Sequence, residues 1–290
     1  MTPVFVDCDN TMGLPGQEID DGLTLLYLLG REDIELVGVS ATHGNGTSEE
    51  AYQQTSWLFE KIGCDTPLHT ADASAKALVA ASLEHPGLVV LGLGALTNLA
   101  AAASLDNAFF SRLGGIYLMG GYTGPLSFRK REVDELNLSS DPAAAHVVLT
   151  APCPVILMSA QYCLHARYGR LDLFVRRGHP AWLQRLIRGW YRAFTGATGA
   201  TGFYLWDLVP AAAVGERAFP FPGKAPLLRC LSTVTDLETG RLVIESATNA
   251  THPSAGPSSP GVISLPDSPF SRRAFVAHCR AHWSRGLTLD

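Results

Sequence analysis

The feature that most constrains the fold is a regular alternation of short apolar runs and helical patterns along the first two thirds of the chain. The apolar runs are continuous rather than alternating, which is typical of strands buried on both faces of a parallel sheet. Strands and helices in alternation predict an α/β fold: a doubly wound, mostly parallel sheet with flanking helices. We expect the strands at residues 4–6, 36–39, 88–93, 116–119 and 155–158, and the helices at 21–29, 48–62, 73–83, 96–103 and 142–149.

After residue 161 the pattern loosens, and a small late hairpin and C-terminal helices are expected. The hairpin strands are predicted at 227–230 and 241–245, the helices at 179–194, 206–213 and 268–283, and loops at 196–202 and 249–261. The segment 196–202 is rich in Gly, Ala and Thr and is expected to be flexible. No shift in composition divides the chain, so residues 1–290 are expected to form a single α/β domain.

Composition excludes some classes of function. A hydrophobic fraction of 47% in 290 residues is enough for a sizeable core. The formal net charge of -5 argues against a nucleic-acid partner, because nucleic-acid binders usually carry a basic face. No apolar run approaches the ~18 residues of a membrane span, and no basic region leads into an apolar export signal. The six scattered cysteines are expected to be reduced thiols of a cytoplasmic protein.

Polar residues recur where the predicted strands end. Asp7 and Asp9 follow the first strand, Asn45 follows the second, and residues 94–98 and 120–121 follow two later strands. In doubly wound sheets, ligands bind outside the carboxyl ends of the strands. We therefore expect a site on this edge of the sheet.

Four aspartates stand between residues 7 and 21: Asp7, Asp9, Asp20 and Asp21. The first pair follows a predicted strand and the second pair opens a predicted helix. Carboxylates this close repel one another, so a metal ion, a shared proton or a polar substrate must hold them together.

One resemblance is to the haloacid-dehalogenase-like phosphatases, whose signature is an apolar strand followed by Asp-x-Asp-x-Thr. Residues 7–11, which read DCDNT, fit this pattern. In that alternative Asp7 attacks phosphorus, Asp9 is the general acid and Mg²⁺ binds the carboxylates. That family also needs a later lysine and an acidic pair near the end of the sheet. The lysine after the last predicted parallel strand is Lys224, and no convincing acidic pair follows it.

A second resemblance uses more of the chain. Asp7-x-Asp9 followed by Asp20-Asp21 resembles the acidic signature Asp-x-Asp-x-x-x-Asp-Asp of the nucleoside hydrolase family. Further segments resemble family motifs in the family's order: Gly44-Asn45, GALTNLA at 94–100, Met119-Gly120-Gly121, ELN at 135–137 with DPAA at 141–144, and Trp206-Asp207. The Trp-Asp pair is most similar to the purine-preferring branch. The resemblance covers about residues 4 to 215.

This resemblance implies a calcium-dependent enzyme that hydrolyses the N-glycosidic bond of ribonucleosides, purine nucleosides preferred, to free base and ribose. It implies Ca²⁺ held by Asp9, Asp21, Asp207 and the backbone carbonyl of Thr97, with Ca²⁺ orienting a water and lowering its pKa. Asp9 would be the general base as that water attacks C1′. The implied substrate contacts are Asp20, Asn45 and Asn137 at the 2′ and 3′ hydroxyls, Glu135 at the 5′ hydroxyl, Met119 against the sugar and Trp206 against the base.

Three features depart from the family pattern. The segment between Asp9 and Asp20 is longer than the usual three residues. The stretch before Glu135 lacks the usual Gly-Asn and carries basic residues at 129–131, which either recognise a substituted 5′ position or form a solvated surface run. The branch with Trp before the last Asp also uses a second stacking Trp from an earlier region, and no tryptophan stands between residues 57 and 182.

A further alternative is non-enzymatic: a calcium-dependent nucleoside- or ribose-binding protein that kept the acidic cluster and lost turnover. In either case the expected partner is a small-molecule nucleoside, with no nucleic acid and no membrane. The resemblance also implies a homodimer or homotetramer and a role in nucleoside salvage in the cytoplasm.

Overall fold

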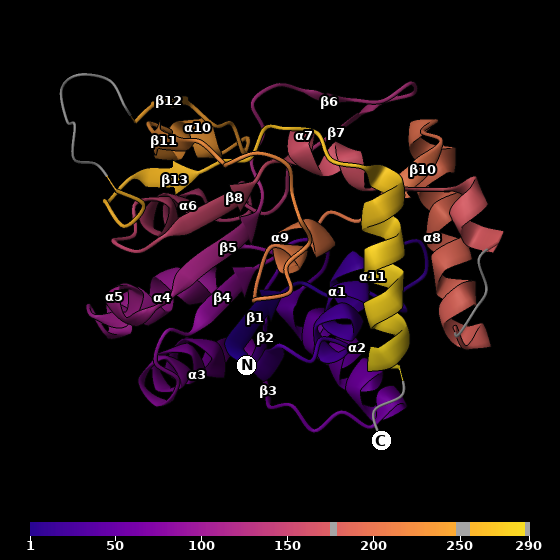
Figure 1. The fold of residues 1–290 in the computed structure, drawn as a ribbon, viewed down its shortest axis with the longest axis horizontal. Helices are drawn as coiled ribbons and strands as arrows, with labels where there is room; N and C mark the ends of the chain where they lie inside the picture. The colour runs from indigo at the N-terminus through magenta and orange to yellow at the C-terminus, as the bar shows by residue number, and fades with distance from the viewer. Residues whose placement is uncertain (175–178, 248–255, 288–290) are drawn as a thin grey trace.

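A nine-stranded sheet forms the centre of the computed structural model, which describes residues 1–174, 179–247 and 256–287 (Figure 1). Its strand order is β12-β11-β13-β8-β5-β4-β1-β2-β3. Neighbours pair in parallel except β11, which is antiparallel to both β12 and β13. The strands are β1 (Thr2–Cys8), β2 (Ile34–Ala41), β3 (Leu68–His69), β4 (Val89–Gly92), β5 (Gly115–Met119), β8 (Val155–Met158), β11 (Leu227–Cys230), β12 (Ile244–Ser246) and β13 (Val262–Ser264).

Helices cover both faces of this sheet. The α-helices of the described residues, not all of which touch the sheet, are α1 (Asp20–Leu29), α2 (Ser48–Ile62), α3 (Ala71–Glu84), α4 (Thr97–Leu105), α5 (Phe109–Arg112), α6 (Pro142–Leu149), α7 (Ala160–Cys163), α8 (Ala181–Thr198), α9 (Leu208–Ala212), α10 (Val234–Leu237) and α11 (Arg272–Gly286). Two small antiparallel pairs, β6 (Leu126–Ser127) with β7 (Glu132–Val133) and β9 (Arg167–Gly169) with β10 (Gly202–Tyr204), lie outside the sheet.

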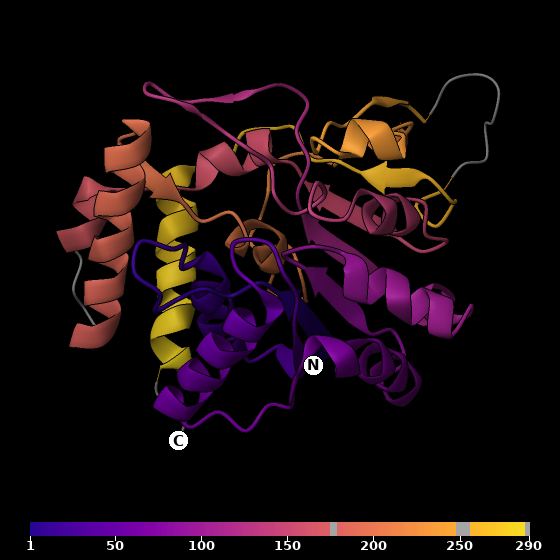
Figure 2. The same ribbon diagram turned by 180° about the vertical axis from the view of Figure 1, so that it is seen from behind.

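The core consists of two apolar layers, one on each face. Val4 and Val6 of β1 pack into one layer with α1, α2 and α11, whereas Phe5 between them packs into the other layer with α3, α4 and α6. Successive strand residues point to opposite faces, so a strand buried on both sides must be apolar throughout. Figures 1 and 2 show the two helix groups on opposite sides of the sheet. In the described parts of the chain, no helix is both long and apolar enough to cross a bilayer.

The predicted α/β fold is confirmed. The five predicted strands correspond to β1, β2, β4, β5 and β8, and the late hairpin to the antiparallel pair β11 and β12. The helix starts also behave as their sequences indicate. Thr47 forms a capping box with Glu50 at the start of α2, and Asp141 accepts the Ala144 N–H before Pro142 at the start of α6. No pattern in the sequence predicted β13, which joins the hairpin to the parallel strands.

The prediction of a loop at 196–202 is wrong for residues 196–198, which are helical. Helix α8 continues to Thr198, where the Thr195 and Thr198 hydroxyls donate to backbone carbonyls one turn earlier. Gly199, with φ of 71°, then ends the helix in the left-handed conformation that glycine adopts freely. Most of the other predicted loop, residues 249–255 of 249–261, lies outside the described residues.

Candidate active site

The first strand and the next helix bring the acidic residues to the carboxyl edge of the sheet. Asp9 directly follows β1, and Asp20 and Asp21 open α1. Carboxylates in the first turn of a helix are favoured by its dipole. Even so, Asp7, Asp9, Asp20 and Asp21 are each at most 1% exposed, which removes their carboxyl groups from water.

The long segment 10–19 between these elements is packed into the protein. The Asn10 amide donates to the Thr55 hydroxyl on α2 at 3.1 Å. The Thr11 hydroxyl donates to the backbone carbonyl of Glu18 at 3.1 Å, which closes the segment into a loop. This departure from the family spacing therefore leaves Asp20 and Asp21 next to Asp9 and adds Glu18 to the surroundings of the site.

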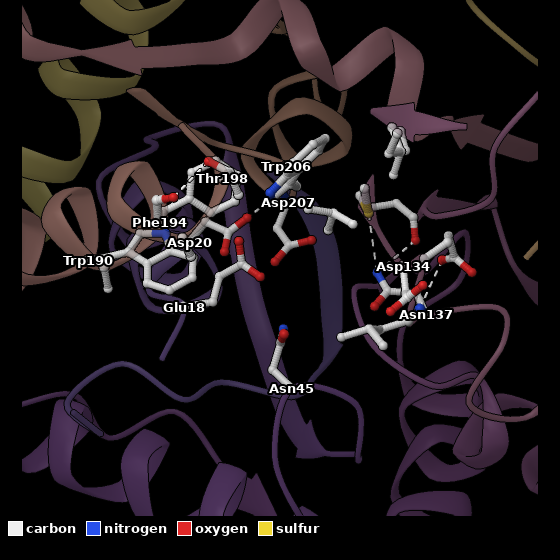
Figure 3. Close-up of a pocket in the computed structure, with 18 of the residues that line it drawn as sticks. Glu18, Asp20, Asn45, Asp134, Asn137, Trp190, Phe194, Thr198, Trp206 and Asp207 are labelled. Atoms are coloured by element: carbon white, nitrogen blue, oxygen red, sulfur yellow. Dashed lines mark hydrogen bonds between the residues drawn. The ribbon is translucent and has the colours of Figure 1, made fainter. Parts of the chain in front are cut away.

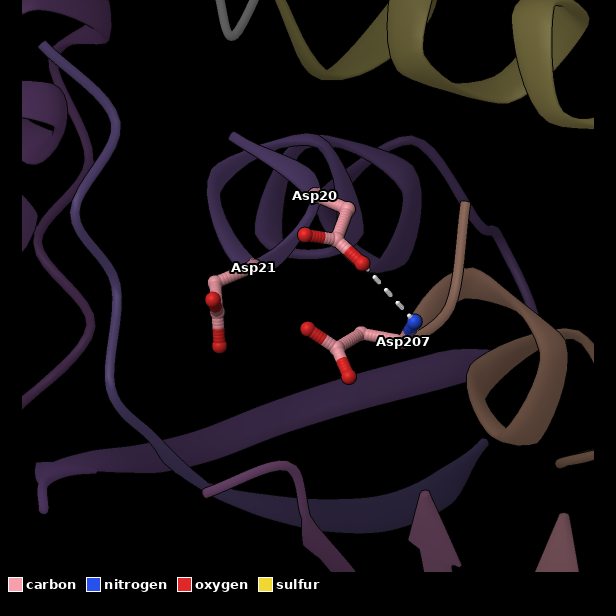
Figure 4. A group of neighbouring side chains, drawn as sticks. All are labelled: Asp20, Asp21 and Asp207. Carbon is pink, nitrogen blue, oxygen red and sulfur yellow. Dashed lines mark hydrogen bonds between the residues drawn. The ribbon is translucent and has the colours of Figure 1, made fainter. Parts of the chain in front are cut away.

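Asp207 joins Asp20 and Asp21 from a distant part of the sequence (Figure 4). One carboxylate oxygen of each of the three lies within 4.8 Å of the others. The backbone N–H of Asp207, just before α9, donates to the Asp20 carboxylate at 3.1 Å. Both carboxylate oxygens of Asp21 and one of Asp20 are buried without a hydrogen-bond partner among the described residues. Such oxygens are costly unless a cation or donor meets them.

The electrostatics of the cluster also favour a bound cation. Burial raises the pKa of Asp20 to about 7 and raises the pKa values of Asp21 and Asp207 well above the usual range for aspartate. Repulsion from the neighbouring carboxylates raises all three pKa values further. A positive ion among them would favour the ionised forms and lower these pKa values.

Asp9 is completely enclosed next to this cluster. One of its oxygens accepts the Asn45 backbone N–H, and the other has no partner among the described residues. A Cβ at Gly44 would collide with the Asp9 carboxylate, and a Cβ at Gly94 would collide with the Thr42 methyl group and crowd Asp9, so both glycines allow this close approach. Burial raises the pKa of Asp9 to about 6, which suits a group that must take a proton near neutral pH.

The donor set fits a hard divalent cation. The available atoms on Asp9, Asp20, Asp21 and Asp207 are all carboxylate oxygens, the ligand type that Ca²⁺ and Mg²⁺ prefer. Asp20, expected at the ribose, also belongs to this metal-capable group. Thr97 begins α4, and its hydroxyl donates to Asp141 at 2.7 Å. The role of its backbone carbonyl as a metal ligand stays a prediction.

Asp7 is not available as a phosphatase nucleophile. It is fully buried, and one of its carboxylate oxygens accepts the Ser40 hydroxyl at 2.5 Å and the Asn98 amide at 2.8 Å. The Asn98 amide also donates to Ala41 at the end of β2. Asp7 therefore ties neighbouring elements of the sheet together, and the haloacid-dehalogenase-like alternative lacks an accessible group to attack phosphorus.

A cavity of about 390 Å³ opens beside the carboxylates (Figure 3). Its lining includes the predicted substrate residues Asp20, Asn45, Met119, Glu135, Asn137 and Trp206, together with Asp207. Asp9 and Asp21 are not in the lining, and they flank it through their contacts with Asn45 and Asp207. This volume is in the usual range for a small-molecule pocket.

The side of the cavity opposite the acidic cluster is held together by hydrogen bonds. The Asn137 amide donates to the Met119 carbonyl at 3.0 Å and to its sulfur at 3.3 Å, which leaves the amide oxygen of Asn137 for a ligand. The Glu135 carboxylate accepts the backbone N–H groups of Asn137, Leu138 and Ser139 at 2.8 to 3.2 Å. Most of its acceptor capacity is thus used within the protein, and its contact with a 5′ hydroxyl stays a prediction.

Two tryptophans, Trp190 and Trp206, line the cavity near Asp20 and Asp207 (Figure 3). Trp206 is 7% exposed and packs on Tyr204 with ring centroids 4.9 Å apart. Trp190, from the middle of α8, lines the same cavity next to Phe194. The second tryptophan therefore comes from a later region of the chain than the family pattern indicates. A usable signal existed, because Trp190 lies on the helical stripe of Leu183, Ile187 and Phe194 that faces the core.

Glu18 is a further lining residue that the motifs missed. Burial raises its pKa well above the usual value, as do the Asp20 and Asp9 carboxylates, whereas hydrogen bonds from Trp206 and Asn45 lower it. Nothing local in the sequence marks it, since its position depends on how the segment 10–19 folds.

Comparison with known proteins covers most of the chain. Residues 4–258 match the family described as inosine-uridine preferring nucleoside hydrolase. Uridine nucleosidase 1 of Arabidopsis thaliana is 24% identical, over 68% of this chain and 70% of the relative. A solved plant nucleoside hydrolase superposes with a TM-score of 0.81 at 17% identity, covering 98% of this chain and 99% of that chain. A purine-preferring ribonucleoside hydrolase from Gardnerella vaginalis superposes with a TM-score of 0.77 at 18% identity, over 100% of both chains.

At such identities the superpositions establish the fold, and the family match establishes the class of chemistry. Buried aspartates beside a cavity of about 390 Å³ are compatible with this chemistry. The chain belongs to the inosine-uridine preferring nucleoside hydrolase family and is an enzyme that hydrolyses N-glycosidic bonds.

Proposed function

We propose that this enzyme hydrolyses purine ribonucleosides to free base and ribose in a calcium-dependent reaction, with Asp9 as the general base. The observation that carries the proposal is the cavity itself. Its lining combines the carboxylates of Asp20 and Asp207 with the indoles of Trp190 and Trp206. A ribose and an attached base need these two kinds of surface in one pocket.

Asp9, Asp21, Asp207 and the carbonyl of Thr97 would hold the cation, with Asp20 beside them. When bound, Ca²⁺ would supply a positive charge that polarises a water and the ribose hydroxyls. The oxygens without partners in the cluster support an oxygen-preferring ion at this place.

The ribose is bound by the polar part of the lining. Asp20 accepts hydrogen bonds from the ribose hydroxyls, Asn45 and Asn137 offer side-chain amides, and Met119 packs on the sugar ring. Glu135 lies at the 5′ end. These contacts orient C1′ toward Asp9, which turns a bimolecular attack by water into an oriented one.

Asp9 takes the proton as the oxygen of water bonds to C1′. The C1′–N bond breaks, its electron pair leaves with the base, and positive charge builds up on the ribose in the transition state. The surrounding carboxylates stabilise this charge electrostatically. The departing base needs a proton or another way to disperse its negative charge.

Trp206 and Trp190 support the purine preference. Aromatic stacking on a base contributes roughly 1–3 kcal/mol, by analogy with single-stranded nucleic acids, and a purine offers the larger face. Trp206 occupies the position before the last Asp, where the purine-preferring branch carries Trp. The relative named as a uridine nucleosidase marks the competing preference for uridine, which base release from the two kinds of nucleoside distinguishes.

The experiment is base release from inosine, guanosine, adenosine, uridine and cytidine, with added Ca²⁺ and again after chelation. Release from the purine nucleosides alone, lost on chelation and restored by Ca²⁺, is the expected result. Faster cleavage of uridine would keep the chemistry and overturn the purine preference. Tight nucleoside binding without any product would favour the catalytically silent binder. Assembly as a homodimer or homotetramer and a cytoplasmic role in salvage stay predictions.

A further inference from the structure

The carboxylate of Glu135 is enclosed by backbone atoms. Its Oε1 accepts the N–H groups of Asn137 and Leu138 at 2.8 and 3.0 Å, and its Oε2 accepts those of Leu138 and Ser139 at 3.1 and 3.2 Å. A carboxylate offers about four lone-pair positions, and these four contacts use them. A Cβ on Gly240 would lie 2.1 Å from Oε2, so backbone also stands directly against that oxygen. The carboxylate therefore stabilises the turn that follows it and is not free to accept a substrate hydroxyl.

The wall of the cavity next to Glu135 is apolar. Val133 stands two residues before Glu135 and pairs with Leu126 across the β6–β7 hairpin, and Leu136 follows Glu135 directly. All three line the cavity, and Leu136 is 41% exposed, so this wall offers apolar surface that a ligand can cover.

Two charged residues, Arg131 and Asp134, belong to the same stretch of the lining. Both are exposed, so water solvates their charges without help from a ligand. The Arg131 Nε–H also donates to the backbone carbonyl of Glu132 at 3.0 Å. These charges therefore do not make the space beside Leu126 and Val133 polar.

Helix α8 supplies a second apolar wall. Ala193, Phe194 and Ala197 line the cavity from this helix. Thr198 also lines it, but its hydroxyl donates to the Phe194 carbonyl at 2.7 Å and accepts the Ala200 N–H at 3.2 Å. The hydroxyl is thus used within the protein, and the two alanines one turn apart leave room that larger side chains would fill.

The hairpin and α8 are joined, so the space between their walls is preformed. The Lys130 ammonium donates to the Gly196 carbonyl at 2.7 Å, and the Lys130 backbone N–H donates to the Thr198 carbonyl at 2.9 Å. Phe128 packs edge-on against Phe194 with ring centroids 5.7 Å apart. A ligand group that enters such a space does not have to order its walls, which favours affinity.

We propose that the preferred substrates are nucleosides without a 5′ hydroxyl, in which the 5′ carbon carries an apolar group such as an alkylthio substituent. This inference rests on the proposed function, which places Glu135 at the 5′ end of the ribose. An apolar group would leave water against Leu126, Val133 and Leu136, which favours binding. A 5′ hydroxyl in the same place would lose its water partners without an acceptor at Glu135, which opposes binding.

The test compares base release from adenosine, 5′-deoxyadenosine and 5′-methylthioadenosine. Uridine and 5′-deoxyuridine form a second pair that does not depend on the purine preference. We expect removal of the hydroxyl to leave kcat/KM equal or higher in both pairs. The methylthio group should raise kcat/KM about tenfold over adenosine, mostly through a lower KM, as expected for burial of two apolar heavy atoms.

A site that hydrogen-bonds the hydroxyl would reject the 5′-deoxy nucleosides strongly. Lower kcat/KM for the 5′-deoxy nucleosides than for their parents would therefore overturn the inference. So would a methylthio compound that is cleaved no better than adenosine. Adenosine 5′-monophosphate is the fourth probe, and a preference for it would assign the 5′ end to Arg131 and overturn the inference as well.

Two variants locate the effect. Leu136→Ala should lower the ratio of kcat/KM for the methylthio compound to that for 5′-deoxyadenosine about threefold, because apolar contact is lost. Leu105→Ala, at an exposed position of α4 outside the cavity, is the control and should keep the ratio. Glu135→Gln should lower kcat/KM for adenosine and for 5′-deoxyadenosine by the same factor, because it disturbs the turn alone. A loss confined to adenosine would show that Glu135 contacts the hydroxyl, against the inference.

Calorimetric binding of the same compounds gives a readout that needs no turnover. The methylthio compound should bind most tightly, and adenosine should bind no more tightly than 5′-deoxyadenosine. If no nucleoside releases its base, the proposed function fails, and the order of the dissociation constants alone decides the inference about the 5′ end. If none of the compounds binds, both fail.

Discussion

The burial of Asp9 bears directly on its proposed role as the general base. Its exclusion from water raises its pKa to about 6, and one of its oxygens lacks a partner. We predict that Asp9→Asn lowers kcat by about 10²–10⁴, the range for losing a general base, while the fold is kept. Initial rates and far-ultraviolet circular dichroism would measure this. Asp65→Asn, at an exposed position after α2, is the matched control, and equal rates for both variants would contradict the assignment.

The site residues that could be predicted from the sequence are those that belong to short motifs. Asp20 and Asp21 share one motif, and Asp207 stands beside Trp206 at the start of a helix. Trp190 and Glu18 could not be assigned in this way, because their approach to the cavity depends on how α8 and the segment 10–19 pack. Glu135 shows the reverse case: the motif identifies the residue, but backbone N–H groups use most of its carboxylate.

Among the contacts between elements, the crossing of α1 and α11 leaves the least room for an added side-chain atom. A Cβ on Gly286 would collide with the backbone carbonyl of Leu26, and one on Gly30 with that of His282. Backbone atoms cannot move aside as side chains can. We predict that Gly286→Ala lowers the free energy of unfolding by about 1–3 kcal/mol, as overpacking does. Denaturant unfolding would measure it.

Gly189→Ala is the control for that change. Gly189 lies inside α8, and an added Cβ would meet no atom within 4 Å. Alanine is the better helix former, so this variant should gain about 0.5–1 kcal/mol. If both variants moved stability in the same direction, the close crossing would not be the cause.

The same pair of helices should respond to pH. The Arg31 guanidinium donates to the Tyr27 hydroxyl at 2.6 Å, and that hydroxyl is 2.8 Å from Nε2 of His278, which can accept only when neutral. Burial, with His282 and Arg31, lowers the pKa of His278 to about 4. The unfolded chain then binds the extra proton between pH 6.5 and about 4, so stability is full above pH 6.5 and falls as pH drops through this window.

We expect this fall to be smaller in His278→Gln than in the wild type. The measurement is unfolding by urea at several values between pH 4 and 7 with Ca²⁺ in excess, and His85→Gln at the end of α3 is the control. Parallel pH profiles for all three proteins would show that His278 does not contribute.

A helix or strand could be predicted from the sequence where its own residues carry a hydrophobic pattern. The five parallel strands are continuous apolar runs because helices cover both their faces, and this pattern is visible in the sequence. β3 has two residues and β13 has three, too few for a pattern, and each is fixed by the neighbour it pairs with. The single-domain expectation stays a prediction, favoured by a sheet whose strands extend from Thr2 to Ser264.

For the whole molecule, the acidic cluster couples metal binding to stability. Asp9 follows β1, Asp20 and Asp21 open α1, and Asp207 precedes α9, so a cation among them links distant parts of the chain. An ion that binds only the folded state stabilises it by about 2.7 kcal/mol at a hundredfold excess over Kd. For a protein of this size we predict a rise in Tm of about 5–10 °C with Ca²⁺ and its loss on chelation.

Asp21→Asn separates this coupling from general effects of salt. The variant removes one buried charge, so its metal-free form should be at least as stable as the metal-free wild type, because the remaining carboxylates repel less. Its Tm should rise little with Ca²⁺, since a ligand with two unpaired oxygens is gone. Asp65→Asn should keep the full rise. A Tm of the wild type that does not change with Ca²⁺, or an equal rise in Asp21→Asn, would mean that the cluster is not the calcium site.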